Sequence, residues 1–149
     1  MLWGDSFGEQ VAPLLPYEAR VYGGTAPCQW LPEIRERAAS RPPAVAVLIF
    51  AGSTQPCGGL DRYVPDTLEA IRVLSAAGTR VFVIVAPCLK SGPAPSTPVY
   101  VDGGVPLVWG PHDSVCPGGA YTEQYRSCDQ HLNAEGVSKF AHQIRAVAG

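Results

Sequence analysis

Met1-Leu2-Trp3-Gly4-Asp5-Ser6 combines a short apolar run, a tight turn and a serine, and a helix-like segment follows from Phe7 to Leu15. This order predicts a strand, a turn and a helix, with Ser6 between the strand's carboxyl end and the helix N-terminus. Backbone N–H groups and the helix dipole favour negative charge at that point. A nucleophilic serine that forms a tetrahedral oxyanion needs such an environment. In the alternative interpretation, Asp5 or Ser6 only caps the helix.

Strand-like and helix-like segments alternate along the rest of the chain, which predicts an α/β fold with a parallel sheet. Further strands are expected at Ala19–Tyr22, Ala44–Phe50 and Arg80–Ala86, and helices at Cys28–Ser40, Asp66–Ala77 and Asn133–Val147. Val99–Val101 and Val105–Trp109 are both candidates for the fifth strand, and Val99–Val101 is preferred. No repeat or domain boundary is visible, so the 149 residues are expected to form one domain.

Two of the expected helices have an apolar face at helical spacing. In the helix expected at Asp66–Ala77, Asp66 is the expected N-cap, and the residues expected to point inward are Leu68, Ile71 and Leu74. In the last helix, the apolar stripe comprises Val137, Phe140, Ile144 and Val147.

Polar residues and glycines gather at the carboxyl ends of the expected strands, where sheets of this kind bind ligands. Ser6, Gly24, Ser53 and the loop after the fourth strand all lie at such ends. The convergence predicts a binding or catalytic site at this edge of the sheet.

A serine hydroxyl needs a base to act as a nucleophile, and the chain has three histidines. His131 is the best candidate, because it lies in a loop just before a helix and can reach across the strand ends. His112, in another loop, is a weaker rival, and His142, inside the last helix, is expected at the surface or in packing.

The motifs Gly4-Asp5-Ser6, Gly23-Gly24, Phe50-Ala51-Gly52-Ser53 and Asp129-Gln130-His131-Leu132-Asn133 occur in this order along the chain. Through them the sequence resembles the SGNH, or Gly-Asp-Ser-Leu, hydrolases over nearly its whole length. The resemblance implies a three-layer α/β/α sandwich of flavodoxin-like layout with a five-stranded parallel sheet. Because only three residues of the first strand precede the motif, part of that strand and a leader are expected upstream.

The resemblance implies a catalytic triad of Ser6 as nucleophile, His131 as base and Asp129 as the acid that orients the imidazole. The common family pattern is Asp-x-x-His, whereas here Cys128 lies three residues before His131 and Asp129 lies two before it. Asp129 could therefore orient His131 from another angle, or lie on the surface and leave a Ser-His dyad.

The resemblance also implies an oxyanion hole made by the backbone N–H groups of Ser6 and Gly24, with Gly23 as an alternative to Gly24. Family members usually add an asparagine side chain after the third strand, and that position is Ser53 here. A serine hydroxyl has a single donor and a shorter reach. Loss of one oxyanion donor costs about two to three orders of magnitude in rate, so the substitution predicts compensation by a neighbour or a slow enzyme.

The expected reaction is hydrolysis of a short acyl ester, such as an acetyl ester of a carbohydrate or small alcohol, through an acyl-serine. One alternative is acyl transfer to a sugar hydroxyl. Others are a degenerate SGNH-like domain that binds a carbohydrate or partner without turnover, and an unrelated α/β domain that binds a small anion. No cofactor is expected, because no metal-ligand cluster or nucleotide-binding fingerprint is visible.

Composition limits the partners and the compartment. With a net charge of −2 and no basic run, nucleic acid is not an expected partner, and the longest apolar run, residues 44–51, is too short to span a membrane. Five cysteines favour an oxidising, extracytoplasmic location, with reduced thiols in a cytoplasmic protein as the alternative. Cys28–Cys57 and Cys57–Cys88 are both conceivable disulfides, and Cys116 and Cys128 bracket the loop before His131.

Overall fold

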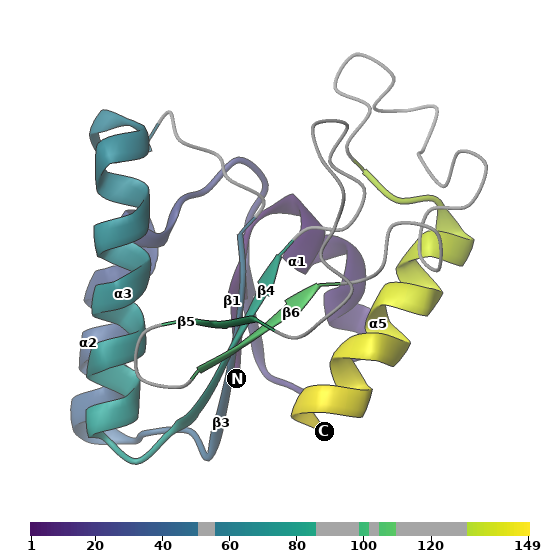
Figure 1. The fold of residues 1–149 in the computed structure, drawn as a ribbon. Helices are drawn as coiled ribbons and strands as arrows, with labels where there is room; N and C mark the ends of the chain where they lie inside the picture. Colours follow the sequence, from purple (N-terminus) through teal and green to yellow (C-terminus); the bar gives the residue numbers. More distant parts are fainter. Residues whose placement is uncertain (51–55, 86–98, 102–104, 110–130) are drawn as a thin grey trace.

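A central β-sheet separates the helices of this protein into two layers (Figure 1), as seen in a computed structural model that describes residues 1–50, 56–85, 99–101, 105–109 and 131–149. Helices α2 (Pro27–Ser40) and α3 (Leu60–Ala76) cover one face of the sheet. Helices α1 (Ser6–Val11) and α5 (Ala134–Ala148) cover the other. The α/β/α layering expected from the sequence is therefore confirmed.

The sheet has the strand order β2-β1-β3-β4-β6-β5, and every neighbouring pair is parallel except β5 with β6. The strands are β1 (Leu2–Gly4), β2 (Ala19–Val21), β3 (Val45–Ile49), β4 (Arg80–Val85), β5 (Val99–Val101) and β6 (Val105–Trp109). The shorter helical turns are η1 (Ala12–Leu14) and η2 (Pro56–Gly58).

The expectation of five parallel strands, with Val99–Val101 as the fifth, is wrong in one respect. The segment Val105–Trp109 is the strand that lies parallel to β4, whereas Val99–Val101 is a sixth, antiparallel strand at the sheet edge. Val101 pairs with Val105, and only three residues separate the two in the sequence. Such a short connection permits only an antiparallel pair, so just one of the two segments can join the parallel sheet.

Helix α3 begins at Leu60, six residues before the expected start, and continues through Pro65. Asp66 is therefore a buried residue inside the helix and not its N-cap, and it accepts a hydrogen bond from the exposed Arg62 side chain at 2.8 Å. Proline predicts a helix boundary because it lacks an N–H donor. Here packing of the surrounding turns against the sheet outweighs that local preference.

Alternate residues of the central strands feed two separate cores, which is why these strands are continuously apolar. Leu2, Val47 and Ile49 face the α1/α5 side, whereas Trp3 and Leu48 face the α2/α3 side. Of the side chains expected to point inward, Leu68 and Val147 are instead exposed, because the buried positions at these places are Ala70 and Ala148. The remaining core positions expected on α3 and α5 are buried or packed against the core: Ile71, Leu74, Val137, Phe140 and Ile144.

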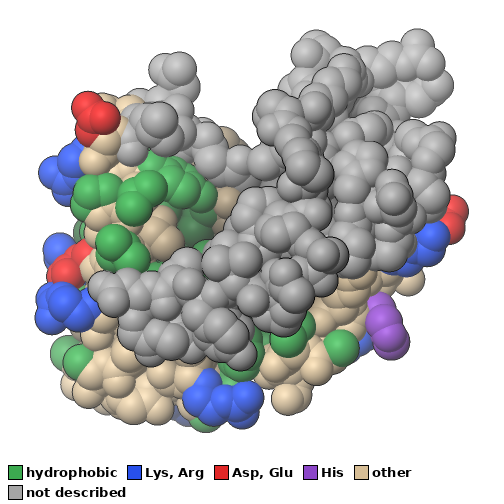
Figure 2. Space-filling model, viewed as in Figure 1, with side chains coloured by type: hydrophobic (Ala, Val, Ile, Leu, Met, Phe, Trp, Pro, Cys, Tyr) green, Lys and Arg blue, Asp and Glu red, His purple; other side chains and the backbone are tan. Residues whose placement is uncertain are grey.

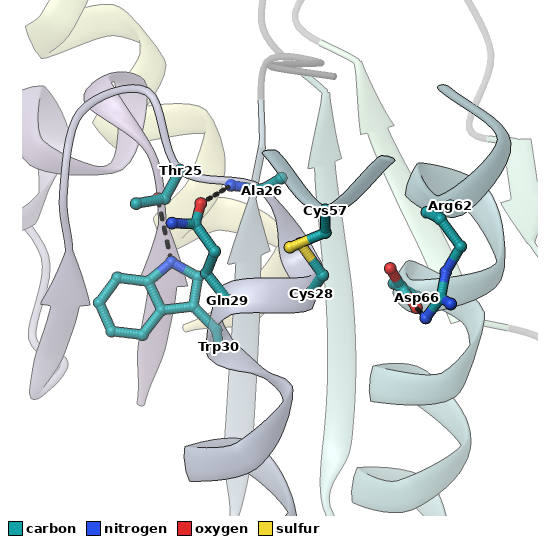
Figure 3. Close-up of a disulfide and its surroundings, with 8 residues drawn as sticks. All are labelled: Thr25, Ala26, Cys28, Gln29, Trp30, Cys57, Arg62 and Asp66. Carbon is teal, nitrogen blue, oxygen red and sulfur yellow. Dashed lines mark hydrogen bonds and ion pairs between the residues drawn. A yellow bond between two sulfur atoms is a disulfide. The ribbon is translucent and has the colours of Figure 1, made fainter. Parts of the chain in front are cut away.

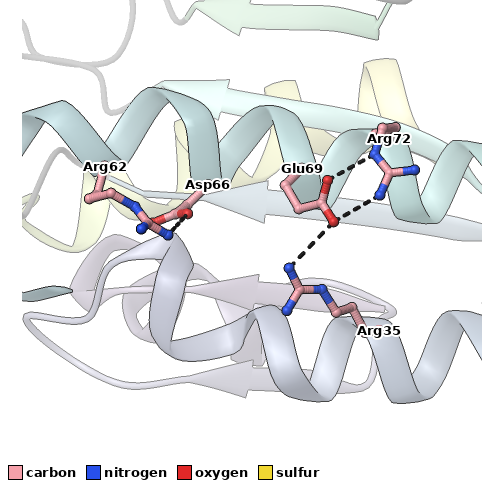
Figure 4. Close-up of polar contacts among 5 residues, drawn as sticks. All are labelled: Arg35, Arg62, Asp66, Glu69 and Arg72. Atoms are coloured by element: carbon pink, nitrogen blue, oxygen red, sulfur yellow. Dashed lines mark hydrogen bonds and ion pairs between the residues drawn. The ribbon is translucent and has the colours of Figure 1, made fainter.

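Ion pairs line the outside of the α2–α3 layer (Figure 4). Glu69 of α3 accepts two hydrogen bonds from Arg72 at 2.8 and 2.9 Å and lies 3.4 Å from Arg35 of α2. The pairing with Arg72, and then with Arg35, lowers the pKa of the Glu69 carboxyl. Because exposed pairs of this kind contribute little to stability, the apolar core beneath them holds the two helices together.

On the face seen in Figure 2, hydrophobic side chains gather over the α3 side, with charges of both signs along the edge. Among the α3 side chains that the structure describes, the exposed large hydrophobic ones are Val64 and Leu68. No helix within the described residues is long and apolar enough to cross a membrane.

Candidate active site

Ser6 is the first residue of α1 and follows β1 after a single intervening residue, Asp5. The buried Asp5 carboxylate caps the helix by accepting a hydrogen bond from the Phe7 N–H at 3.0 Å. Because Asp5 performs the capping, the Ser6 hydroxyl is not needed for it.

The turn between β1 and α1 is tight because Gly4 has no side chain. A Cβ atom at Gly4 would lie 2.6 Å from the backbone oxygen of Ile49 in β3, which is too close for any other residue. Glycine therefore allows β1 to end directly against β3 and sets the position of Ser6 above the sheet.

His131 lies against Ser6 although 125 residues separate them in the sequence. The distance between His131 Nε2 and Ser6 Oγ is 2.7 Å, which is a hydrogen bond. The imidazole also stacks on the buried Phe7 ring, with centroids 5.4 Å apart and planes 13° from parallel. This is the geometry in which a histidine removes a proton from a serine hydroxyl.

Burial lowers the pKa of the His131 imidazole below its usual 6.5, and the negative charge of Glu9 partly opposes this shift. A lowered pKa keeps the imidazole neutral at physiological pH. A neutral ring can accept the serine proton, as a general base must.

The loop after β2 carries Gly23 and Gly24 beside Ser6. A Cβ atom at Gly23 would lie 3.7 Å from Ser6 Cβ and 3.1 Å from Glu9 Oε2, so this part of the loop runs directly past the serine. Gly24 has φ of +75°, a left-handed conformation that favours glycine.

Thr25 holds this loop to the sheet. Its buried hydroxyl donates to the Tyr22 carbonyl at 2.7 Å and lies 3.2 Å from the Gly4 carbonyl. The same hydroxyl accepts a hydrogen bond from Trp30 Nε1 at 3.0 Å (Figure 3). The glycines between Tyr22 and Thr25 are thereby fixed beside the end of β1.

A disulfide joins Cys28, at the start of α2, to Cys57 in η2 (Figure 3). Of the two pairings conceivable for Cys57, Cys28–Cys57 is confirmed and Cys57–Cys88 is excluded. The bond links the glycine loop after β2 to the segment that follows residues 51–55, so it ties together two chain segments that leave the carboxyl edge of the sheet.

The remaining expected site residues, Ser53 and Asp129, lie outside the described residues, as does the rival base His112. His142 is exposed on α5, as expected. Within the described part of the chain, no group of three His, Cys, Asp or Glu side chains could hold a metal ion.

Three residues near the site were not anticipated from the sequence: Phe7, Gln10 and Thr25. The helical period offers a signal for Gln10, because it lies one turn after Ser6 and on the same helix face. Thr25 and Phe7 have no comparable signal, since their roles depend on partners from other elements.

Comparison with known structures finds the same fold in several enzymes and candidate enzymes. A candidate acylhydrolase from Bacteroides fragilis superposes with a TM-score of 0.67 and 18% identity, covering 98% of this chain and 84% of that one. A GDSL-like lipase from Bacteroides thetaiotaomicron superposes with a TM-score of 0.66 and 14% identity, covering 98% of this chain and 85% of that one. TesA superposes with a TM-score of 0.59 and 14% identity, covering 97% of this chain and 94% of that one.

Neither a protein-family model nor a curated protein sequence matches the chain. The structural neighbours are thus proteins of the SGNH type over nearly the whole chain, at low identity. The resemblance first seen in the motifs extends to the fold, and function must be argued from the site itself.

Proposed function

We propose that this protein is a serine hydrolase that cleaves esters of short acyl groups through an acyl-serine intermediate. The observation that carries the proposal is the 2.7 Å contact between Ser6 Oγ and His131 Nε2 at the carboxyl edge of the sheet. The SGNH-type fold of the structural neighbours supports it, since one of them is described as a lipase and another as a candidate acylhydrolase.

In the first half-reaction, His131 takes the hydroxyl proton of Ser6 while Oγ attacks the ester carbonyl carbon. The tetrahedral intermediate collapses when His131 gives this proton to the leaving alcohol oxygen, and the acyl group remains on Ser6. In the second half, His131 takes a proton from water, which attacks the acyl carbon. Release of the acid returns the proton to Ser6 and regenerates the site.

The negative oxygen of the intermediate needs donors beside Ser6. We assign this role to the backbone N–H groups of Ser6 and Gly24, with the Ser53 side chain as a third donor. The position of Ser6 at the start of α1 supports the first assignment, because the first N–H groups of a helix have no acceptor within it. Asp129 is proposed to hold the His131 tautomer.

The proposed substrate is an acetyl-like ester of a carbohydrate or small alcohol, and the proposed location is extracytoplasmic. The Cys28–Cys57 disulfide supports the location, because such bonds persist in oxidising compartments. Transfer of the acyl group to a sugar hydroxyl shares the same acyl-enzyme, and product analysis with a sugar acceptor would separate the two outcomes.

The proposal is tested with p-nitrophenyl acetate and a fluorophosphonate probe on the wild type, Ser6→Ala, His131→Ala and His142→Ala. We expect Ser6→Ala and His131→Ala to lose about three orders of magnitude or more in kcat, and Ser6→Ala to lose labelling. His142→Ala is the matched control, because this histidine is exposed on α5 and should keep wild-type activity.

A folded wild type that neither labels nor turns over the ester would contradict the proposal and favour a non-catalytic binding domain. Retained turnover in Ser6→Ala would assign the activity to another group.

A further inference from the structure

The base of the proposed reaction, His131, is attached to α1 by a contact that does not involve the imidazole. Gln10 Nε2 donates to the Leu132 carbonyl at 2.8 Å, and the Leu132 N–H donates to Gln10 Oε1 at 3.2 Å. One carboxamide therefore binds both backbone polar groups of the residue next to His131. The two partners lie 122 positions apart in the sequence.

A carboxamide suits this contact because it carries one acceptor and one donor group at its tip. Leu132 is only 1% exposed, so little water can reach its backbone N–H and carbonyl to replace Gln10 if the contact is broken. An unsatisfied buried backbone group is costly, so the pairing resists displacement of this segment.

Gln10 and Ser6 lie one helical turn apart on the same face of α1. The helix thus contacts the same short segment twice: Ser6 bonds the His131 ring, and Gln10 bonds the Leu132 backbone. On the far side, the Asn133 side chain accepts a hydrogen bond from Gly136 at 3.0 Å and caps α5. The backbone is fixed immediately after His131, which leaves the imidazole little room to move away from Ser6.

We infer that Gln10 is a positioning residue, which holds the His131 base at the Ser6 nucleophile by binding the Leu132 backbone. This inference rests on the proposed serine-hydrolase function. This role accounts for a half-buried glutamine on the same face as Ser6 in a helix of only six residues.

The test uses Gln10→Leu, which keeps the approximate size and removes both hydrogen bonds, and Gln10→Glu, which keeps the acceptor and loses the donor at neutral pH. Small displacements of reacting groups can cost about 100-fold in rate, so we expect kcat of Gln10→Leu to fall by about 10- to 100-fold. KM should stay within about threefold of wild type, because no substrate contact is removed. Gln10→Glu should retain more activity than Gln10→Leu.

A second readout follows the His131 ring itself by NMR titration. If the ring leaves its buried position in Gln10→Leu, its pKa should rise from the lowered wild-type value toward 6.5, and the acid limb of kcat/KM should move with it. Gln143→Leu on α5 is the matched control for loss of a half-buried glutamine; it should change neither kcat nor the titration. Thermal unfolding of each variant separates positioning from general loss of stability.

Wild-type kcat and an unchanged His131 titration in Gln10→Leu would overturn the inference, and so would an equal loss of kcat in Gln143→Leu. If the wild type itself has no esterase activity, the proposed function fails. In that case the NMR titration of His131 tests the inference by itself. A shifted His131 pKa in Gln10→Leu supports the positioning role, and an unchanged pKa overturns it.

Discussion

At the scale of single residues, the chemistry of the site depends on the protonation of His131. Burial favours the neutral imidazole, and the Glu9 carboxylate near Gly23 favours the charged form, with burial the larger effect. Since the unfolded chain then binds a proton more readily than the folded one, this group costs stability as pH falls below about 6.5. The neutral ring is also the form that acts as a base, so folding and activity are both favoured at the higher pH.

Glu9→Gln should move the acid limb of the kcat/KM profile to lower pH, because removing the negative charge lowers the pKa of His131 further. Activity on the high-pH plateau should stay within about twofold of wild type, since the base is already neutral there. A pH–rate profile with p-nitrophenyl acetate measures the shift, and Glu36→Gln, exposed on α2, is the matched control. A Glu9→Gln profile that moves to higher pH, or does not move, would contradict this electrostatic assignment.

At the scale of elements, α5 connects the site to the core. Its N-cap, Asn133, lies two residues after His131, and Phe140 and Ile144 anchor the helix against the sheet. Near its other end, the helix donates a hydrogen bond from the Arg145 side chain to the Leu14 carbonyl at 2.7 Å. The position of the base therefore depends on docking of the whole helix.

Phe140→Ala should lower the free energy of unfolding by about 3–5 kcal/mol, because it leaves a cavity where a fully buried ring packs. Val147→Ala on the same helix should change it by no more than about 0.5 kcal/mol, because this side chain is 41% exposed. Denaturant unfolding measures both. Equal losses in the two variants would mean that α5 is not docked as described.

At the scale of the whole molecule, the Cys28–Cys57 disulfide closes a loop that contains β3, the central strand between β1 and β4. The bond joins segments 29 residues apart and restrains the unfolded chain as well as the folded one. The bond joins the first turn of α2 to η2 and so lies on the α2/α3 side of the sheet, whereas His131 stacks on Phe7 on the α1/α5 side.

Replacing both cysteines by serine should lower the free energy of unfolding by roughly 3–4 kcal/mol in the chain-entropy model for a loop of this length. Guanidinium unfolding of the wild type and the double variant measures the difference. Adding a reductant to the double variant isolates the effect of the other three cysteines. Identical midpoints for the two untreated proteins would show that the bond is absent in solution.

Sequence patterns were sufficient for the elements whose signals are local: the strand–turn–helix around Ser6, the strand β3 and the last helix. Motif order also led to His131 and to the SGNH-type fold. A local signal failed at Pro65 inside α3, where packing outweighs the preference of proline for a helix boundary. Local signals also did not tell which of β5 and β6 lies parallel to β4, because that choice depends on pairing with a distant strand. Periodicity likewise could not separate Leu68 from the buried Ala70, because burial depends on what packs opposite.

Contacts between distant parts of the chain became known from the three-dimensional structure alone. The bond of Ser6 to His131, the stacking on Phe7 and the binding of Leu132 by Gln10 join segments more than 120 residues apart. The choice of Cys28 as the partner of Cys57 is of the same kind. A sequence pattern predicts on which face of its helix or strand a side chain lies. The packing of the helices against the sheet determines which residues of other elements contact that face.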